Sequence, residues 1–337
     1  VFLLALDPMG SSSLHLLRAE SPGPSVGKIV PKMRQTAKIL YLLYVALTVA
    51  DIICLLIGKL SFFEAVCTAF STAGTGGFGI KADGMASFTP YIQNVCTVFM
   101  MLFGINFTCF YLLLLGNFKS VFKNEELRFY LGTFVAAVAL ISINVHGMYD
   151  TVGETIRHSA FQVASLVTST GFATTDFNLW PPFSKAILFV LMFVGACAGS
   201  TGGGIKCSRV LLYIKTFFRS IRQTLHPQKI QLIRLNGEPT DEKIIRSTLG
   251  YLCAYVILIL ASFFLVSVDG FSFETNMSSV VSCFNNMGPG FDSAGPMSNY
   301  GGFSAFSKLV LIWDMLAGRL EIFPILVLFS PSTWRRS

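Results

Sequence analysis

One order of segments occurs three times along this chain of 337 residues. A long apolar run is followed by a short apolar run, a stretch rich in glycine and hydroxyl residues, and a second long apolar run. A helix needs about 20 apolar residues to cross a bilayer, and shorter apolar runs are typical of re-entrant or buried segments. Each copy therefore predicts two membrane-spanning helices with a half-length helix between them that enters the membrane and turns back.

Composition agrees with a membrane protein. Hydrophobic residues make up 53% of the chain and charged residues only 13%, against roughly 25% charged residues in soluble domains. These values exclude a disordered chain, a solvated nucleic-acid-binding domain and most soluble enzymes. The eight Cys form no C-x-x-C and lie mainly in apolar runs, so neither disulfides nor a metal site is expected. The sequence predicts an all-α polytopic membrane protein of repeated helix–re-entrant pore helix–helix units.

The Lys and Arg residues gather in every second loop. Segments 14–38, 116–128 and 206–246 hold five, three and nine of them, whereas the alternate loops hold five in total. Cytoplasmic loops carry the Lys/Arg excess. The C-terminus is therefore expected to be cytoplasmic, and all three glycine-rich stretches are expected to open to the outside. This topology also explains the net charge of +7, so no nucleic-acid partner is expected.

The chain starts in an apolar stretch with no charged segment before it. Residues 1–6 run directly into Asp7-Pro8, without the basic start and cleavage site of a signal peptide. We interpret residues 1–19 as the end of a truncated first repeat. The complete copies are accordingly the second repeat (36–116), the third repeat (127–219, with a broken final helix) and the fourth repeat (246–330), followed by a cytoplasmic tail (331–337).

The glycine-rich stretches place non-helical backbone at membrane depth. Such backbone is tolerated only where protein buries it or where it lines a water-filled path, and there its carbonyl oxygens can replace the hydration shell of a cation. Aligned by their glycines, the stretches superimpose Gly74, Gly171 and Gly288. The candidate cation filter consists of Thr72, Ala73, Gly74 and Thr75, then Ser169, Thr170, Gly171 and Phe172, then Asn286, Met287, Gly288 and Pro289.

Other interpretations of the glycine-rich segments are weaker. One such loop could be an extracellular turn, but three copies, each behind an amphipathic half-span, argue against that. The segment 74–79 matches G-x-G-x-x-G, yet a dinucleotide fingerprint needs a strand before it and a helix after it. The segment 199–206 is similar to a phosphate-binding loop, but its lysine is misplaced for that motif.

A second kind of glycine-rich segment interrupts the last apolar run of the third repeat. Glycine weakens a helix by roughly 1 kcal/mol per residue relative to alanine, and five of these ten residues are glycine. Small residues also let helices approach closely, although five glycines exceed that need. The segment consists of Gly195, Ala196, Cys197, Ala198, Gly199, Ser200, Thr201, Gly202, Gly203 and Gly204.

Five stretches together resemble the superfamily of Trk, Ktr and HKT potassium transporters, and its bacterial TrkH/TrkG branch in particular. They are Ala198-Gly199-Ser200-Thr201-Gly202-Gly203-Gly204-Ile205-Lys206, Asn286-Met287-Gly288-Pro289-Gly290-Phe291, Gly318-Arg319-Leu320-Glu321-Ile322-Phe323, the segment 17–24 and the segment 329–336. The resemblance covers nearly the whole chain. It implies four repeats around one pseudo-fourfold pore and K⁺ uptake across a bacterial inner membrane.

The same resemblance implies site roles and partners. K⁺ is the transported ion and binds at the filter carbonyls, while the segment 195–204 lies beneath the filter and acts as its gate. A homodimer is implied, together with a TrkA-like cytoplasmic nucleotide-binding regulatory subunit. The nine Lys and Arg residues of segment 206–246 offer that subunit a docking surface. Neither a cofactor nor an enzymatic activity is expected, because no feature suggests ATP hydrolysis or covalent chemistry.

Arg319 is a cation inside a predicted span. It lies ten residues before Phe329, which places it about 15 Å from that end of a helix. A charge at such depth is costly and is a functional hypothesis by default. We expect Arg319 to be a barrier to cations in the inner pore. The structural alternatives are snorkelling or an ion pair with Asp314 or Glu321.

Two other functions remain to be weighed. A secondary cation transporter, coupled to Na⁺ or H⁺, would have broken helices and a midplane site. It would also show inverted repeats, whereas all three glycine-rich stretches here are expected to face one side. An intramembrane hydrolase would need a His near a Ser or Cys, and the four His residues fall at predicted boundaries or loops.

Overall fold

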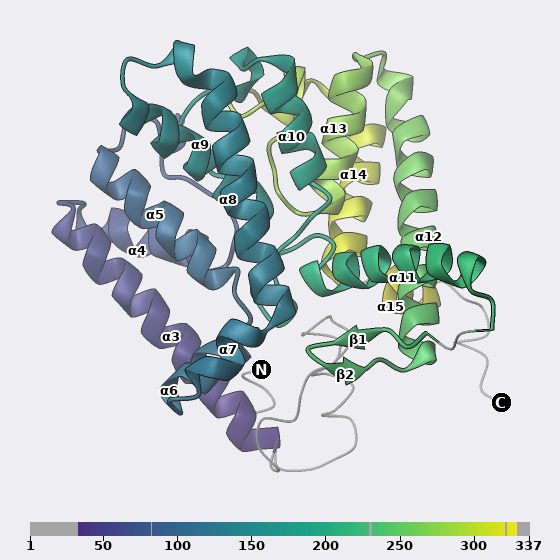
Figure 1. Ribbon diagram of the computed structural model, residues 1–337. Coiled ribbons are helices and arrows are strands. Elements are labelled where there is room, and N and C mark those ends of the chain that lie inside the picture. Colours follow the sequence, from purple (N-terminus) through teal and green to yellow (C-terminus); the bar gives the residue numbers. More distant parts are fainter. Residues whose placement is uncertain (1–32, 82, 229–230, 321, 329–337) are drawn as a thin grey trace.

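The computed structural model describes residues 33–81, 83–228, 231–320 and 322–328 (Figure 1). The expected end of a first repeat at residues 1–19 and the tail at residues 331–337 lie outside the described residues, as does Glu321. The all-α class is confirmed. The principal elements are α3 (Met33–Ile57), α4 (Phe62–Ala73), α5 (Pro90–Phe103), α6 (Phe107–Leu114), α7 (Phe118–Lys123), α8 (Glu125–Val145), α9 (Val152–Val167), α10 (Pro182–Leu191), α11 (Cys207–Leu225), β1 (Arg234–Leu235), β2 (Glu238–Pro239), α12 (Glu242–Val266), α13 (Phe273–Phe284), α14 (Ala305–Arg319) and α15 (Ile322–Leu328).

Among the described residues, three helical stretches are long and apolar enough to cross a membrane: Lys38–Ile57 in α3, Glu125–Met148 starting with α8 and Glu242–Asp269 starting with α12. The bent pair α5 and α6 would be a fourth if it forms one span. Each of the three stretches starts one helix–short helix–helix set. Large apolar side chains such as Leu42, Ile143 and Phe264 are exposed on these helices. An apolar surface of this kind suits lipid contact, because the hydrocarbon core offers no competing water.

The short helices α4, α9 and α13 begin in the same way. Their N-cap residues Ser61, Thr151 and Ser272 each accept a hydrogen bond from a backbone N–H of the first turn, and an acidic residue stands in that turn of each helix. At α4 the cap is reciprocal, because the hydroxyl and N–H of Ser61 both donate to the Glu64 carboxylate. These bonds hold the pKa of Glu64 below its usual range. The three helices thus start at fixed, polar positions.

The second long helix of each set is broken, which corrects two predictions. The apolar run 91–115 is long enough for one of the two spans predicted for the second repeat, but α5 and α6 within it meet at an angle of 90°. Likewise α14 ends at Arg319 and α15 starts at Ile322, although one continuous run was expected there. The predicted break in the third repeat is confirmed, since α10 and α11 flank residues 192–206.

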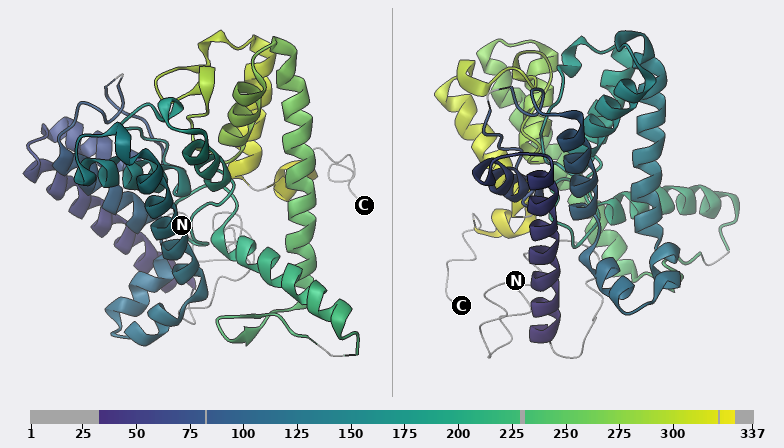
Figure 2. Two further views of the ribbon diagram at one scale, coloured as in Figure 1. Left: turned by 45° about the horizontal axis from the view of Figure 1, so that its top comes forward. Right: turned by 90° about the vertical axis from the view of Figure 1, so that its left-hand side faces the viewer.

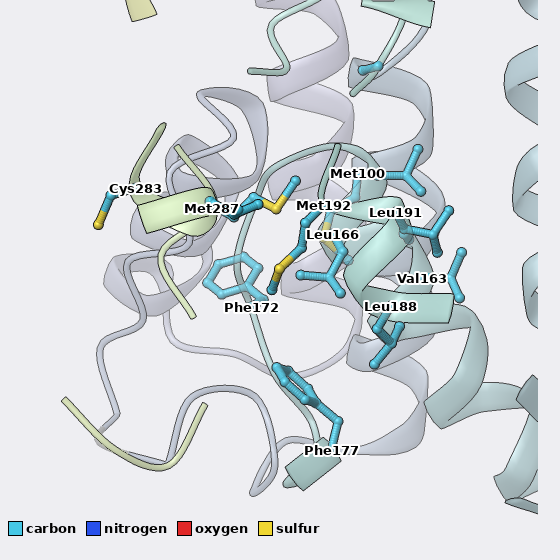
Figure 3. Close-up of a cluster of buried hydrophobic side chains, with 14 of the residues drawn as sticks. Met100, Val163, Leu166, Phe172, Phe177, Leu188, Leu191, Met192, Cys283 and Met287 are labelled. Atoms are coloured by element: carbon cyan, nitrogen blue, oxygen red, sulfur yellow. The ribbon is translucent and has the colours of Figure 1, made fainter. Parts of the chain in front are cut away.

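The helices surround a buried apolar core. Figure 3 shows part of it, with Leu166 from α9, Leu188 from α10 and Met192 directly after α10. In the lower part of Figure 1, α11 runs crosswise to α12. The antiparallel strands β1 and β2 form a hairpin beside α11 (Figures 1 and 2).

Candidate functional site

The three short helices end in the same backbone turn. The residue two positions beyond each helix adopts a positive φ: Thr75 (49°), Ser169 (55°) and Asn286 (56°). Two residues later φ is positive again, at Gly77 (68°), Gly171 (84°) and Gly288 (98°). Because non-glycine residues rarely adopt positive φ, this threefold recurrence marks one structural motif.

Hydrogen bonds confirm the register of the three turns. The N–H of Gly76 donates to Ser71 O (2.8 Å), that of Thr170 to Ser165 O (2.8 Å), and that of Met287 to Ser282 O (2.9 Å). The glycine that corresponds to Gly171 and Gly288 is therefore Gly77. The alignment on Gly74 was wrong by three residues: Gly74 is the C-cap of α4, with an ordinary φ of −79°.

The three turns lie edge to edge. A Cβ on Gly77 would stand 2.0 Å from the carbonyl oxygen of Thr170, and a Cβ on Gly171 would stand 1.8 Å from that of Met287. Each turn thus packs its glycine against the backbone of the next. A Cβ on Gly288 would meet no atom of the described chain within 4 Å, so the series ends at the fourth repeat.

A cavity of about 630 Å³ lies beside these turns. Its walls include Gly74, Thr75 and Gly76 from one side and Met287 and Gly288 from the other. The second and fourth repeats therefore face each other across this space, and the third joins them on the far side. The three turns therefore follow one another in chain order, and the cavity lies beside the first and the last of them.

The apolar side chains of the turns point into the core, which leaves backbone groups at the surface of the turns. The side chains of Phe172 and Met287 are buried in the apolar cluster of Figure 3. The carbonyl of Phe172 accepts from Ser165 Oγ at 2.6 Å, and the carbonyl of Gly288 accepts from Tyr300 Oη at 2.7 Å. These bonds fix the turns from behind. In addition, each short helix points its negative C-terminal end at them, a favourable arrangement for a cation.

The segment 195–204 lies against all three turns, so the structure brings the predicted gate and filter residues together. Thr75 Oγ1 donates to the carbonyl of Thr201 at 3.0 Å. In the third repeat, Ser169 Oγ accepts from the N–H of Gly203. A Cβ on Gly203 would lie 2.6 Å from the carbonyl oxygen of Asn285 in the fourth repeat. Glycine is needed here because backbone meets backbone.

The base of this segment is paired and anchored. The N–H of Gly195 donates to Ile205 O (2.8 Å), and the N–H of Cys207 donates to Ala196 O (3.0 Å). The N–H of Cys197 donates to the carbonyl of Gly104 at 3.0 Å, at the break between α5 and α6. In a continuous helix the carbonyl of Gly104 would accept an N–H from the next helical turn. Here it accepts the N–H of Cys197 instead, which accounts for a bend that hydropathy does not predict.

Arg319 contacts the same segment. Its guanidinium donates to the carbonyl of Thr201 at 3.2 Å and lines the cavity. The ion pair considered with Asp314 is contradicted. The Asp314 carboxylate instead accepts from Ser262 Oγ at 2.6 Å, in the buried contact between α14 and α12. Arg319 and Thr75 therefore share one acceptor at the centre of the segment.

Two charged residues of the site were not expected. Lys206 is buried and donates to the carbonyl of Gly202. Glu126 is buried and accepts from the N–H groups of Ala198 (2.7 Å) and Ser208 (3.0 Å). In the sequence both lie near span ends, where charge signals topology alone. No group of three or more His, Cys, Asp or Glu that could hold a metal occurs among the described residues.

The fold and the site together define a polytopic α-helical membrane protein built from three helix–short helix–helix units. Comparison with known proteins narrows this class. The model of the TrkH family, described as cation transport proteins, matches residues 2–336. The chain is 34% identical to the Trk system potassium uptake protein TrkH of Salmonella typhimurium, over 99% of this chain and 70% of that protein.

Two further similarities agree. The Trk system potassium uptake protein TrkH of Halomonas elongata is 32% identical over 98% of this chain and 69% of its own length. The crystal structure of the potassium transporter TrkH from Vibrio parahaemolyticus matches with a TM-score of 0.85 and 29% identity, covering 96% of this chain and 69% of that one. The chain belongs to the TrkH family of cation transport proteins.

Proposed function

We propose that this protein mediates K⁺ uptake across the bacterial inner membrane. The observation that carries the proposal is the edge-to-edge packing of three identical backbone turns against one glycine-rich segment. Relatives that share a third of its residues are named as potassium uptake proteins of the Trk system. The repeats 36–116, 127–219 and 246–330 would occupy three of the four positions of a pseudo-fourfold pore.

The filter is proposed to consist of the backbone at Thr75–Gly77, Ser169–Gly171 and Asn286–Gly288, together with the helix ends that precede them. Carbonyl oxygens held at a fixed spacing can replace the hydration shell of K⁺. The hydrogen bonds from Tyr300 to the carbonyl of Gly288 and from Ser165 to the carbonyl of Phe172, directly after the third-repeat turn, support such fixed spacing. No cofactor is needed, since the ion itself is the cargo.

The segment 195–204 is proposed to be the gate. It presents backbone to all three turns. Its base is paired by hydrogen bonds, and its centre is held by bonds to Thr75, Ser169 and Arg319. Thr75 and Arg319 both donate to the Thr201 carbonyl, so they stabilise the segment in the path of the ion. The guanidinium adds a positive charge there, which raises the energy of a passing cation.

Orientation and partners follow from charge. The Lys/Arg-rich segment 206–246 is proposed to face the cytoplasm, as is the C-terminus. It would dock a TrkA-like nucleotide-binding regulatory subunit, in keeping with the system named for the relatives. A homodimer is proposed as the assembled form.

Ion flux into liposomes tests the proposal. The reconstituted protein should take up Rb⁺ in preference to Na⁺, and uptake should respond to the regulatory subunit and its nucleotide. Imposed pH and Na⁺ gradients distinguish a passive pore from a coupled transporter. Equal Rb⁺ and Na⁺ fluxes in a folded protein would contradict the proposed filter.

A further inference from the structure

Two consecutive glutamates begin α8, and they face different parts of the molecule. Successive residues of a helix point about 100° apart, so neighbours in sequence can contact separate partners. Glu126 faces inward and is buried, whereas Glu125 is half-buried and faces the β1–β2 hairpin. Neither contact is needed to form the helix, whose N-terminus is already capped by the side chain of Asn124.

The inward contact holds both ends of the proposed gate. A single carboxylate oxygen of Glu126 accepts from the N–H of Ala198, before the centre of the gate segment, and from the N–H of Ser208, just after it. Ser208 lies in the first turn of α11, where unpaired N–H groups favour an anion. A displacement of Glu126 therefore moves Ala198, within the segment, and Ser208, which follows it, at the same time.

The outward contact reaches the hairpin. Glu125 is ion-paired with Lys215 of α11, and its N–H donates to Asn236 Oδ1 at 2.8 Å. Lys215 also donates to the carbonyl of Arg234 at 2.6 Å. Asn236 and Gly237 both have positive φ, as a two-residue type I′ turn requires. The hairpin is thus bonded directly to the first turn of α8.

We propose that Glu125 and Glu126 are positioning residues that couple the β1–β2 hairpin to the gate segment. The proposal rests on the gate assigned above. A partner that moves the hairpin shifts the first turn of α8 through Glu125. Glu126, one residue on, then shifts the two backbone N–H groups that frame the gate. Because Ala198 and Ser208 lie next to the paired base of the segment, a small displacement there changes the position of its centre.

Hydrogen exchange and flux measured on the same full-length protein test the coupling. Lys215→Ala removes the ion pair of the outward contact without touching the gate, and it leaves the bond between the Glu125 N–H and Asn236 in place. Exchange in segment 196–208 should rise roughly two- to thirtyfold, the range that coupling through such networks spans. Rb⁺ flux should rise with it, at an unchanged Rb⁺/Na⁺ ratio. The double exchange Glu125→Lys with Lys215→Glu restores the ion pair but not the bond to the Arg234 carbonyl, which a carboxylate cannot donate, so it should restore both values in part.

The matched control is Lys185→Ala, which breaks an ion pair of similar exposure with Glu274 between α10 and α13 and should leave segment 196–208 unchanged. Glu126→Gln retains an acceptor oxygen and should act more weakly than Glu126→Ala. Faster exchange confined to the hairpin in Lys215→Ala would overturn the coupling. Faster exchange in segment 196–208 with unchanged flux would support the coupling and instead refute the gate.

Discussion

Alanine at Gly77 tests the register of the filter. The structure equates Gly77, not Gly74, with Gly171 and Gly288, so the two neighbouring glycines should behave differently. A Cβ at position 77 would lie 2.0 Å from a carbonyl oxygen, whereas a Cβ at position 74 would lie 3.1 Å from the Phe70 oxygen. Contacts below 3.0 Å force a shift, so Gly77→Ala must push neighbouring filter turns about 1 Å apart while Gly74→Ala need not.

The cost follows from two terms. A non-glycine residue in the left-handed region costs roughly 1–2 kcal/mol, and overpacking of a tight site costs typically ~1–3 kcal/mol. A difference of ~1.4 kcal/mol corresponds to a factor of ten. If that part of the cost is lost from the discrimination between the two ions, the Rb⁺/Na⁺ ratio falls tenfold. Gly171→Ala, with a Cβ 1.8 Å from its neighbour, should match Gly77→Ala. Gly288→Ala adds strain without a clash and should have an intermediate effect.

The assay is Rb⁺ and Na⁺ uptake per folded protein, with the thermal midpoint recorded for each variant. Gly74→Ala serves as the matched control and should keep the wild-type ratio. If Gly74→Ala lowered the ratio as much as Gly77→Ala, the register derived from the hydrogen bonds would be wrong. Wild-type ratios in both Gly77→Ala and Gly171→Ala would refute the filter.

Three further predictions concern the gate and the outer loop. Arg319→Ala removes a charge and a bond to the Thr201 carbonyl, so flux of both cations should rise severalfold at an unchanged Rb⁺/Na⁺ ratio; lower flux with a lower thermal midpoint would make the residue structural. Deleting residues 199–203 should raise flux and abolish the response to the regulatory subunit, and a folded, normally regulated deletion variant would refute the gate. The hydroxyls of Ser272 and Thr275 donate to the Asp292 carboxylate and lower its pKa. Their stabilisation is therefore present above the ordinary aspartate pKa of about 3.9 and is lost as the pH falls through the lower folded value. The thermal midpoint of wild type should fall over that window more than that of Asp292→Asn, and parallel curves would contradict this assignment.

The repeat architecture could be predicted from local signals. Hydropathy identified the three helix–short helix–helix sets, because the length of an apolar run decides whether it can span a bilayer. Glycine content identified the break between α10 and α11, because each glycine weakens a helix independently of its neighbours in space. Both properties belong to consecutive residues, so no tertiary contact is needed to detect them.

The register of the filter required the structure. The second repeat offers Gly74, Gly76, Gly77 and Gly79, and matching glycines by type cannot tell which of them has a positive φ. That choice is made where α4 ends, by the bond from the Gly76 N–H to the Ser71 carbonyl, and by the approach of Thr170 from another repeat.

Tertiary contacts also decided which charges serve the gate. The bend between α5 and α6, the two N–H groups on Glu126 and the Thr201 carbonyl below Arg319 all join residues far apart in the chain. A buried polar group must find a partner, but its sequence does not name that partner. By itself, the sequence determined the membrane class, the repeats and the two kinds of glycine-rich segment. Only the packing of the repeats decided which backbone groups and charges meet, because those bonds are made between segments that hydropathy and propensity treat separately.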